Sequence, residues 1–310
     1  MAPRRTFVVG TRGSRLALRQ TDLMVQALRS HHPDLEIEVR EIRTEGDRRP
    51  QESLSLIGGQ GIFVKELEAA LLRRDIDLAV HSLKDVPTEL APGLTLAAMP
   101  QRADPRDALV SRNNATLAQL PPGARVGTGS ARRAAQIRAL RPDIETIDIR
   151  GNVDTRIRKV DDGEFDAAVL AVAGLERLGL LDRAAEVLAT DVMLPAVGQG
   201  ALTIEARDDD SEVIDLLRAV DHRETRLACE AERAFMKRLG GGCLLPFGAL
   251  ATVDGDEVTA HGFIADAEGA RAFRAKVSGA AGEAEAVGVQ LAEALLAQGA
   301  AEFVEAVETP

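Results

Sequence analysis

The sequence predicts an α/β protein with two doubly wound domains and a smaller α+β third domain, and three observations lead to this prediction. Short apolar strand patterns alternate with helical patterns in the first part of the chain. The alternation restarts after Pro105. Beyond residue 240 the pattern changes to a hairpin followed by an alanine-rich helix. Strands that alternate with helices indicate sheets whose two faces are both covered.

The first domain is predicted from four strand patterns that are bounded by turn residues. These patterns are Thr6–Gly10, Glu36–Arg40, Ile76–Val80 and Leu94–Ala98. Apolar residues at helical spacing predict helices over residues 16–28 and 65–72. A further strand, Ala201–Glu205, follows a long interval, so we expect the chain to leave the first domain and return to it.

The second domain is predicted between two short crossing segments, Met99–Pro105 and Leu194–Gly200. Strands are expected at residues 125–127, 145–149 and 167–171, and helices at 131–140 and 153–160. Two crossings imply two linkers with a cleft between the domains. The expected boundaries are 1–100 with 200–218 for the first domain, 105–194 for the second and 220–310 for the third.

The third domain is predicted to begin within a long helix over residues 211–239, which the following glycines should end. Residues 249–253 and 257–264 flank the turn Asp254-Gly255 and are typical of a hairpin. A third strand at 271–277 and a helix at 283–304 complete a small domain with a three-stranded antiparallel sheet.

Composition limits the possible classes of protein. Of 310 residues 45% are apolar and 28% charged, as in globular proteins, and no apolar run is long enough to span a bilayer. The N-terminal residues lack a secretory signal, and two cysteines in a chain of this length indicate a reducing compartment, so we expect a cytoplasmic protein. A net charge of −11 disfavours nucleic-acid binding. The cysteines and histidines do not cluster, so no metal site is expected.

Arginines and small polar residues gather where predicted strands give way to helices. The three turns are Thr11–Ser14, Gly127–Arg133 and Arg150–Arg156. Helix N-termini at the carboxyl ends of strands offer N–H groups to anions, and guanidinium groups bind carboxylates in a bidentate manner. Each arginine alone is as well explained as a solvated surface charge. Together they predict a ligand with several carboxylates.

Two further stretches carry reactive groups. Lys84 and Asp85 belong to the stretch His81–Pro87, which directly follows the strand Ile76–Val80. A carboxylate at this end of a strand could stabilise a developing cation or move a proton. The alternative for Asp85 is a capping box with Ser82. Cys243 follows three glycines, and it is either an ordinary buried thiol or an attachment point or nucleophile.

In their order and spacing, ten motifs resemble the porphobilinogen deaminase (hydroxymethylbilane synthase) family along nearly the whole chain. They are TRGSRLAL (11–18), GGQGIFVKELE (58–68), AVHSLKDVP (79–87), DPRDA (104–108), VGTGSARR (126–133), RGNVDTR (150–156), LAVAGLERLGL (170–180), LPAVGQGA (194–201), AERA (231–234) and GGCLLPFG (241–248). The resemblance implies two hinged domains like those of periplasmic binding proteins, plus a third domain. It also implies a monomeric transferase of tetrapyrrole (haem) biosynthesis, which joins four porphobilinogen molecules with loss of ammonia and then releases hydroxymethylbilane by hydrolysis.

The resemblance also implies a role for each matching residue. Cys243 would carry a dipyrromethane cofactor through a thioether, and Asp85 would be catalytic. The cofactor would further be bound by Lys84, Thr128, Gly129, Ser130, Arg132, Arg133 and Arg156. The substrate would be bound by Arg12, Ser14, Phe63, Arg150, Arg177 and Gln199.

Three positions depart from the pattern of the family. Leu56 and Gln60 stand where relatives often carry lysines, which puts in doubt that this segment grips substrate carboxylates. Gly129 stands in place of a common serine and removes one hydroxyl group. Two rival hypotheses are a non-catalytic two-domain protein that binds carboxylate ligands and a cysteine hydrolase.

Overall fold

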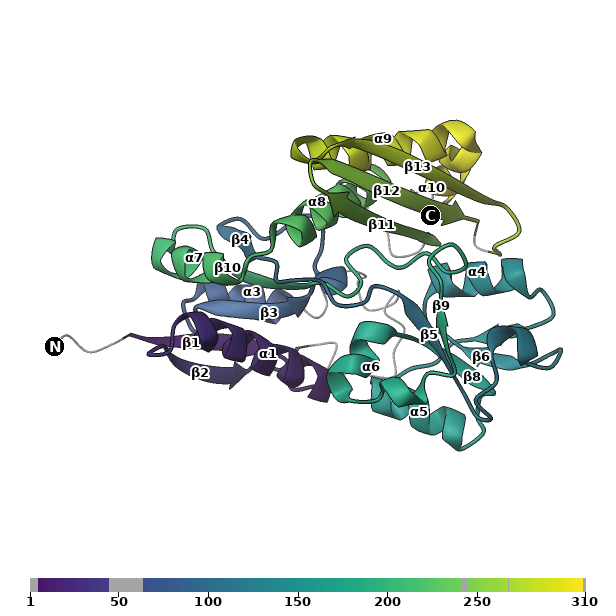
Figure 1. Ribbon diagram of the computed structural model, residues 1–310, viewed down its shortest axis with the longest axis horizontal. Coiled ribbons are helices and arrows are strands. Elements are labelled where there is room, and N and C mark those ends of the chain that lie inside the picture. The colour runs from purple at the N-terminus through teal and green to yellow at the C-terminus, as the bar shows by residue number, and fades with distance from the viewer. Residues whose placement is uncertain (1–4, 45–63, 241–244, 267, 309–310) are drawn as a thin grey trace. The chain divides into compact units, whose positions relative to one another are not determined.

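The structure is a computed structural model that describes residues 5–44, 64–240, 245–266 and 268–308. Its chain divides into two compact units. The first unit comprises Met1–Arg102 and Ala201–Arg226, and the second comprises Ala103–Gly200 and Leu227–Pro310. The first unit contains one five-stranded sheet, and the second contains a five-stranded and a three-stranded sheet (Figure 1).

The sheet of the first unit has the strand order β2-β1-β3-β10-β4. The strands are β1 (Thr6–Thr11), β2 (Glu36–Glu41), β3 (Leu78–Ser82), β4 (Leu94–Ala98) and β10 (Leu202–Arg207). β1 pairs in parallel with β2 and β3, whereas β10 runs antiparallel to β3 and β4. All five strands predicted here are confirmed to within two residues.

Helices cover both faces of this sheet, as predicted for an α/β fold. On one face the helices α1 (Arg15–His31) and α7 (Ser211–Leu217) bury apolar side chains such as Leu28 and Val213 against β3 and β10. On the other face α3 (Lys65–Leu72) packs Leu67 and Leu71 against Ile76 and Ala79. Burial of this kind contributes about 1.5–3 kcal/mol for each large apolar side chain.

The five-stranded sheet of the second unit has the order β7-β6-β8-β5-β9. The strands are β5 (Asp107–Ser111), β6 (Arg125–Gly127), β7 (Glu145–Ile147), β8 (Ala167–Ala171) and β9 (Glu186–Leu188). The helices are α4 (Ala131–Leu140), α5 (Val153–Asp161) and α6 (Val172–Leu178). Sequence reasoning missed β5, β9 and α6. β5 begins with a charged residue, which only its tertiary partners make compatible with a buried strand.

The three-stranded sheet is antiparallel, with the order β11-β12-β13. Its strands are β11 (Phe247–Asp254), β12 (Glu257–Ala265) and β13 (Ala272–Ala280). The helices α8 (Arg223–Arg238) and α9 (Ala284–Leu295) share an apolar core with it that includes Phe235, Val258 and Leu291. Figure 1 shows α9 lying along this sheet. The hairpin and third strand predicted from the sequence are confirmed.

Two predicted helices are each interrupted in the structure. The stretch 211–239 is α7, a turn and α8, because Asp221 and His222 pair with the backbone of Met99 through hydrogen bonds of 2.7 and 2.9 Å. The stretch 283–304 is α9, a π turn at Leu296–Ala300 and α10 (Ala301–Glu308), and Gly299 adopts a φ of 115° there. α8 does stop where the glycines predict, with Gly240 at a φ of 83°.

Short helical turns complete the described chain. They are η1 (Leu83–Asp85), η2 (Leu117–Gln119), η3 (Leu181–Arg183), η4 (Arg218–Val220) and η5 (Ala281–Glu283). Of these, η1 holds Lys84 and Asp85 directly after β3. None of the described helices combines the length and the apolar character needed to cross a membrane.

Candidate functional site

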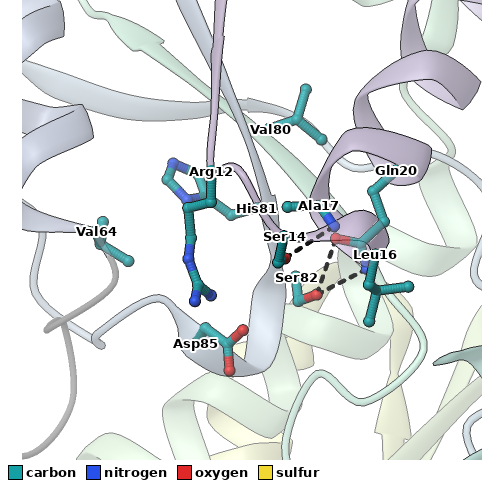
Figure 2. A pocket seen from close by; sticks show the side chains of 10 residues that line it. All are labelled: Arg12, Ser14, Leu16, Ala17, Gln20, Val64, Val80, His81, Ser82 and Asp85. Atoms are coloured by element: carbon teal, nitrogen blue, oxygen red, sulfur yellow. Dashed lines mark hydrogen bonds between the residues drawn. The ribbon is translucent and has the colours of Figure 1, made fainter. Parts of the chain in front are cut away.

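A polar pocket lies in the first unit at the carboxyl ends of β1 and β3. Because these strands are parallel neighbours, the residues that follow them meet at one edge of the sheet. Arg12 and Ser14 follow β1, and His81, Ser82 and Asp85 come from β3 and the turn after it; all five line the pocket (Figure 2). The structure thus brings together three residues that the sequence predicted for binding and catalysis.

Asp85 is the carboxylate of this pocket, and it is partly exposed. It makes no hydrogen bond or ion pair within the described part of the chain. The capping-box alternative is wrong, because Ser82 makes no capping bond to η1 and its Oγ instead accepts a hydrogen bond of 2.9 Å from Gln20 Nε2. Figure 2 shows the guanidinium group of Arg12 extending toward Asp85. The carboxylate is therefore available to a ligand.

Ser14 serves the fold as well as the pocket. It is the N-cap of α1, and its Oγ accepts a hydrogen bond of 3.2 Å from the backbone N–H of Ala17. Gln20, one turn further along α1, is buried and also lines the pocket. Sequence reasoning assigned no role to Gln20 or His81 and gave Ser82 only the capping alternative, although Ser82 and His81 lie inside a motif that it singled out.

In the second unit, the turn after β6 carries three predicted cofactor-binding residues. Ser130 caps α4 by accepting a hydrogen bond of 3.4 Å from the N–H of Arg133, and Thr128 Oγ1 accepts one of 3.2 Å from the N–H of Ser130. A Cβ atom at Gly129 would lie 3.0 Å from an oxygen of Asp148. A larger residue at this position would therefore require the Asp148 side chain to move.

Asp107 is the centre of a buried network in the same unit. Its two oxygens accept hydrogen bonds of 2.8 Å from Arg132 and 2.6 Å from Arg133, and Gln199 adds a third of 2.9 Å. All four side chains are at least nine-tenths buried. Burial by itself raises the pKa of a carboxyl group, but the two guanidinium groups more than offset this and lower the pKa of Asp107 below its ordinary value. Sequence reasoning gave Asp107 no role.

Replacing Asp107 with asparagine is expected to lower the free energy of unfolding by about 3–5 kcal/mol, because two guanidinium groups would remain buried without their counter-charge. The lowered pKa means that this contribution is present above the ordinary pKa of aspartate, near 4, and is lost as the pH falls. Urea unfolding of both proteins at pH 7 and at lower pH measures it. Asp143→Asn is the control, since its ion pair with Arg141 lies nearer the surface. Equal stability of wild type and Asp107→Asn at pH 7 would contradict this prediction.

Arg156 and Arg177 are guanidinium groups that pair with no carboxylate among the residues the structure describes. Each donates to a backbone carbonyl group instead, Arg156 to Gly151 at 2.8 Å and Arg177 to Gly200 at 2.7 Å. Burial, together with the nearby charges of Arg133 and Arg150, lowers the pKa of Arg156 from 12.5 to about 10. Burial likewise lowers the pKa of Arg177 to about 10. A bound anion would remove the cost of these partly buried cations, so both are suited to bind carboxylates.

The remaining predicted residues fall into three groups. Arg150 lies beside Arg156 and donates a hydrogen bond of 2.8 Å to Asp148, and Lys84 is partly buried in η1. Arg132, Arg133 and Gln199 contact Asp107 in the interior, so their direct contact with a ligand stays a prediction. Phe63 and Cys243, and the departures Leu56 and Gln60, lie outside the described residues. No cluster of three or more His, Cys, Asp or Glu side chains suited to a metal ion occurs in the described ranges.

Comparisons with known proteins agree over nearly the whole chain. The family model "Porphobilinogen deaminase, dipyromethane cofactor binding domain" matches residues 7–215, and "Porphobilinogen deaminase, C-terminal domain" matches residues 226–297. The chain is 52% identical to the porphobilinogen deaminase of Roseiflexus sp. (strain RS-1) over 96% of its own length and 97% of that protein. It is 49% identical to the enzyme of the same name from Brevibacillus brevis, over 96% of each chain.

Similarity to solved structures is more distant. The crystal structure of the methionine binding protein MetQ has a TM-score of 0.45 and 14% sequence identity, and the match covers 69% of this chain and 89% of that one. The periplasmic arginine-binding protein STM4351 of Salmonella typhimurium has a TM-score of 0.39 and also 14% identity, with 70% and 92% covered.

Proposed function

The chain belongs to the porphobilinogen deaminase family, and from this membership we propose that Asp85 is its catalytic residue and Cys243 its cofactor-bearing residue. The enzyme is a transferase of tetrapyrrole biosynthesis. It joins four porphobilinogen molecules head to tail, with loss of one ammonia for each, and releases hydroxymethylbilane by hydrolysis. The rival hypotheses of a binding protein without catalysis and of a cysteine hydrolase account for neither the family match nor the motif order.

The dipyrromethane cofactor of the family, when bound, supplies a covalently held pyrrole end to which substrate units are added. The residues proposed to hold it are Cys243 through a thioether and Lys84, Thr128, Gly129, Ser130, Arg132, Arg133 and Arg156 through its acidic side chains. The guanidinium groups of the second unit fit such a group. Among the described residues, Arg132 and Arg133 share the carboxylate of Asp107 and Arg150 pairs with Asp148, whereas Arg156 forms no ion pair there.

The single observation that best supports the proposed function is that two partly buried guanidinium groups of the second unit, those of Arg156 and Arg177, pair with no carboxylate of a described residue. Porphobilinogen carries one acetate and one propionate side chain, so a chain of up to six rings brings about a dozen carboxylates that need cationic partners. We propose that Arg12, Ser14, Phe63, Arg150, Arg177 and Gln199 bind the carboxylates and ring of the substrate. Within this set, burial lowers the pKa of Arg177 to about 10, and its guanidinium group forms no ion pair with a described residue.

Asp85 is proposed to stabilise positive charge on the substrate. When the amino group of the aminomethyl side chain of porphobilinogen leaves as ammonia, the electron pair of the carbon–nitrogen bond goes with it, the methylene carbon stays on the ring, and positive charge spreads onto the pyrrole nitrogen. A carboxylate that is already in place, and that pairs with no described residue, can stabilise this charge without first giving up another partner. The low dielectric of a closed site strengthens that interaction relative to water.

Replacing Arg156 with glutamine tests the proposed role of the uncompensated guanidinium groups. Loss of a charge-assisted hydrogen bond costs about 1.5–3 kcal/mol. We therefore expect the KM for porphobilinogen to rise, or the fraction of protein that assembles its cofactor to fall, by about 10- to 100-fold. Steady-state kinetics and intact mass measure the two effects. Arg158→Gln is the matched control, because it lies exposed on the same helix. Unchanged values in Arg156→Gln would remove this residue from the site.

We further propose that the protein acts as a monomer in the cytoplasm. The cytoplasmic location is supported by the few cysteines and the absence of a long apolar run in the sequence, and the monomeric state only by the family resemblance. Light scattering of the purified protein and fractionation of cells that produce it would test the two statements separately.

A further inference from the structure

A buried pair of titratable side chains forms part of the wall of the Asp85 pocket. His81 on β3 is 5% exposed, and Glu205 on β10 is fully buried. Because Thr203 is the partner of His81 in the antiparallel register, Glu205, two residues further on, projects from the same face of the sheet. His81 Nε2 and Glu205 Oε2 lie 3.0 Å apart.

Glu205 has one side-chain partner among the described residues, and that partner is His81. The hydrogen bond involves Glu205 Oε2, and the other oxygen, Oε1, has no hydrogen-bond partner among these residues. A second carboxyl group, that of Glu68 on α3, lies near enough that burial first and then Glu205 raise the pKa of Glu68. A buried carboxyl group with an unsatisfied oxygen is costly, so the hydrogen bond between Glu205 and His81 fixes the orientation of the imidazole.

The contact with Glu205 also determines which nitrogen of His81 is left without a partner among the described residues. Nε2 points to the carboxylate and is therefore the nitrogen that carries a proton in the neutral ring. Nδ1 then holds the free electron pair, and no hydrogen bond from a described residue occupies it. His81 lines the same pocket as Arg12 and Asp85 (Figure 2).

We propose that His81 is a second catalytic residue of this site, which accepts the proton released at carbon in each condensation, and that Glu205 is its positioning residue. This proposal rests on the proposed function. When the new carbon–carbon bond has formed, the pyrrole α-carbon still carries its hydrogen. Its carbon–hydrogen bond breaks, the electron pair restores the aromatic ring, and the proton goes to Nδ1. Glu205 stabilises the imidazolium ion, which passes the proton to the released ammonia.

This assignment separates two tasks that one carboxylate performs poorly together. Asp85 must stay ionised while the substrate is cationic, and a carboxylate that takes up the proton at that moment loses its stabilising charge.

The groups around His81 are Glu205 on β10, Glu68 and Lys65 on α3, Arg12 after β1 and Asp85 in η1. Two of the three carboxyl groups, Glu205 and Glu68, belong to the elements that pack over the imidazole.

The kinetic test compares His81→Gln and Glu205→Gln with wild type. We expect kcat to fall about 100-fold or more in His81→Gln and about 10-fold in Glu205→Gln, with KM little changed. With porphobilinogen deuterated at its free α-carbon, both variants should show a larger primary isotope effect than wild type, because proton loss from carbon becomes slow. Thr203→Val is the matched control. Thr203 is the buried cross-strand neighbour of His81, and its hydroxyl group donates a hydrogen bond of 3.2 Å to the backbone oxygen of Ala98. This variant should keep the wild-type isotope effect.

A second measurement on the wild-type holoenzyme does not depend on any variant that might misfold. Nitrogen-15 NMR of its histidines should show one buried imidazole that is protonated at Nε2 and not at Nδ1 in the neutral form. A proton on Nδ1, or an unchanged isotope effect and kcat in folded His81→Gln, would overturn the proposal. If instead the wild-type protein does not condense porphobilinogen at all, the proposed function fails. Activity of the wild-type protein therefore distinguishes failure of the His81 proposal from failure of the proposed function.

Discussion

Replacing Cys243 with serine is expected to give a protein whose intact mass is that of the bare polypeptide and which makes no hydroxymethylbilane. A serine hydroxyl group cannot form the thioether, and without a covalent primer each substrate unit has nothing to be added to. The wild-type protein should instead be heavier than its 33.0 kDa chain by two linked pyrrole units. Mass spectrometry of freshly purified protein, with the colour reaction of dipyrromethanes, measures both.

The second cysteine provides the control for this experiment. Cys229 is fully buried within α8, so Cys229→Ala should keep the mass increase and the colour reaction at some cost in stability. An adduct that persists in Cys243→Ser, or that disappears in Cys229→Ala while the fold is retained, would place the attachment elsewhere. A bare-chain mass in active wild-type protein would contradict a covalent cofactor altogether.

Local sequence pattern was sufficient to predict most strands because their signal is local. Apolar stretches such as Ile76–Val80 and Ala167–Ala171 are buried on both faces, and their burial needs no knowledge of distant partners. The interruptions of the long helices were not predictable in this way. The break at Asp221 arises from hydrogen bonds to Met99, which is more than a hundred residues distant in sequence.

The same limit explains which site residues the sequence revealed. Arg12, Asp85 and Arg156 stand out because they are polar residues at the ends of apolar strands or at the start of helices, where ligands bind in α/β sheets. Asp107 and Glu205 have no such local signal. Each is a carboxylate within a buried strand, and its meaning depends on partners from other elements: the arginines of α4 for Asp107, and His81 for Glu205.

Arg132 and Arg133 show how a correct location can leave a role open. The sequence placed both arginines at the start of α4, and the structure confirms that position. Their guanidinium groups, however, bind Asp107 in the interior. In this structure the two guanidinium groups compensate the buried charge of Asp107. The proposal adds a second role, which is to bind carboxylates of the cofactor.

Replacing Asp85 with asparagine is expected to lower kcat by about 10³-fold while the fold and the binding of porphobilinogen are largely retained. Asparagine keeps the size of the side chain but removes the charge that stabilises the cationic substrate. Because Asp85 forms no hydrogen bond or ion pair with the described residues, its replacement breaks no contact of the resting pocket. Rapid-quench measurement of ammonia release, together with thermal unfolding, separates the chemical effect from a structural one.

Asp22→Asn is the matched control for this substitution, because Asp22 is an exposed carboxylate of α1 whose charge lies in a surface ion pair with Arg19. It should react at the wild-type rate. A second comparison uses the intact mass. If Asp85→Asn has the mass of the cofactor-bearing protein but releases ammonia slowly, the loss of activity lies in the chemical step and not in cofactor assembly. If Asp85→Asn releases ammonia at the wild-type rate, then the cation is stabilised by another group, and the available carboxylate beside Arg12 has a binding role only.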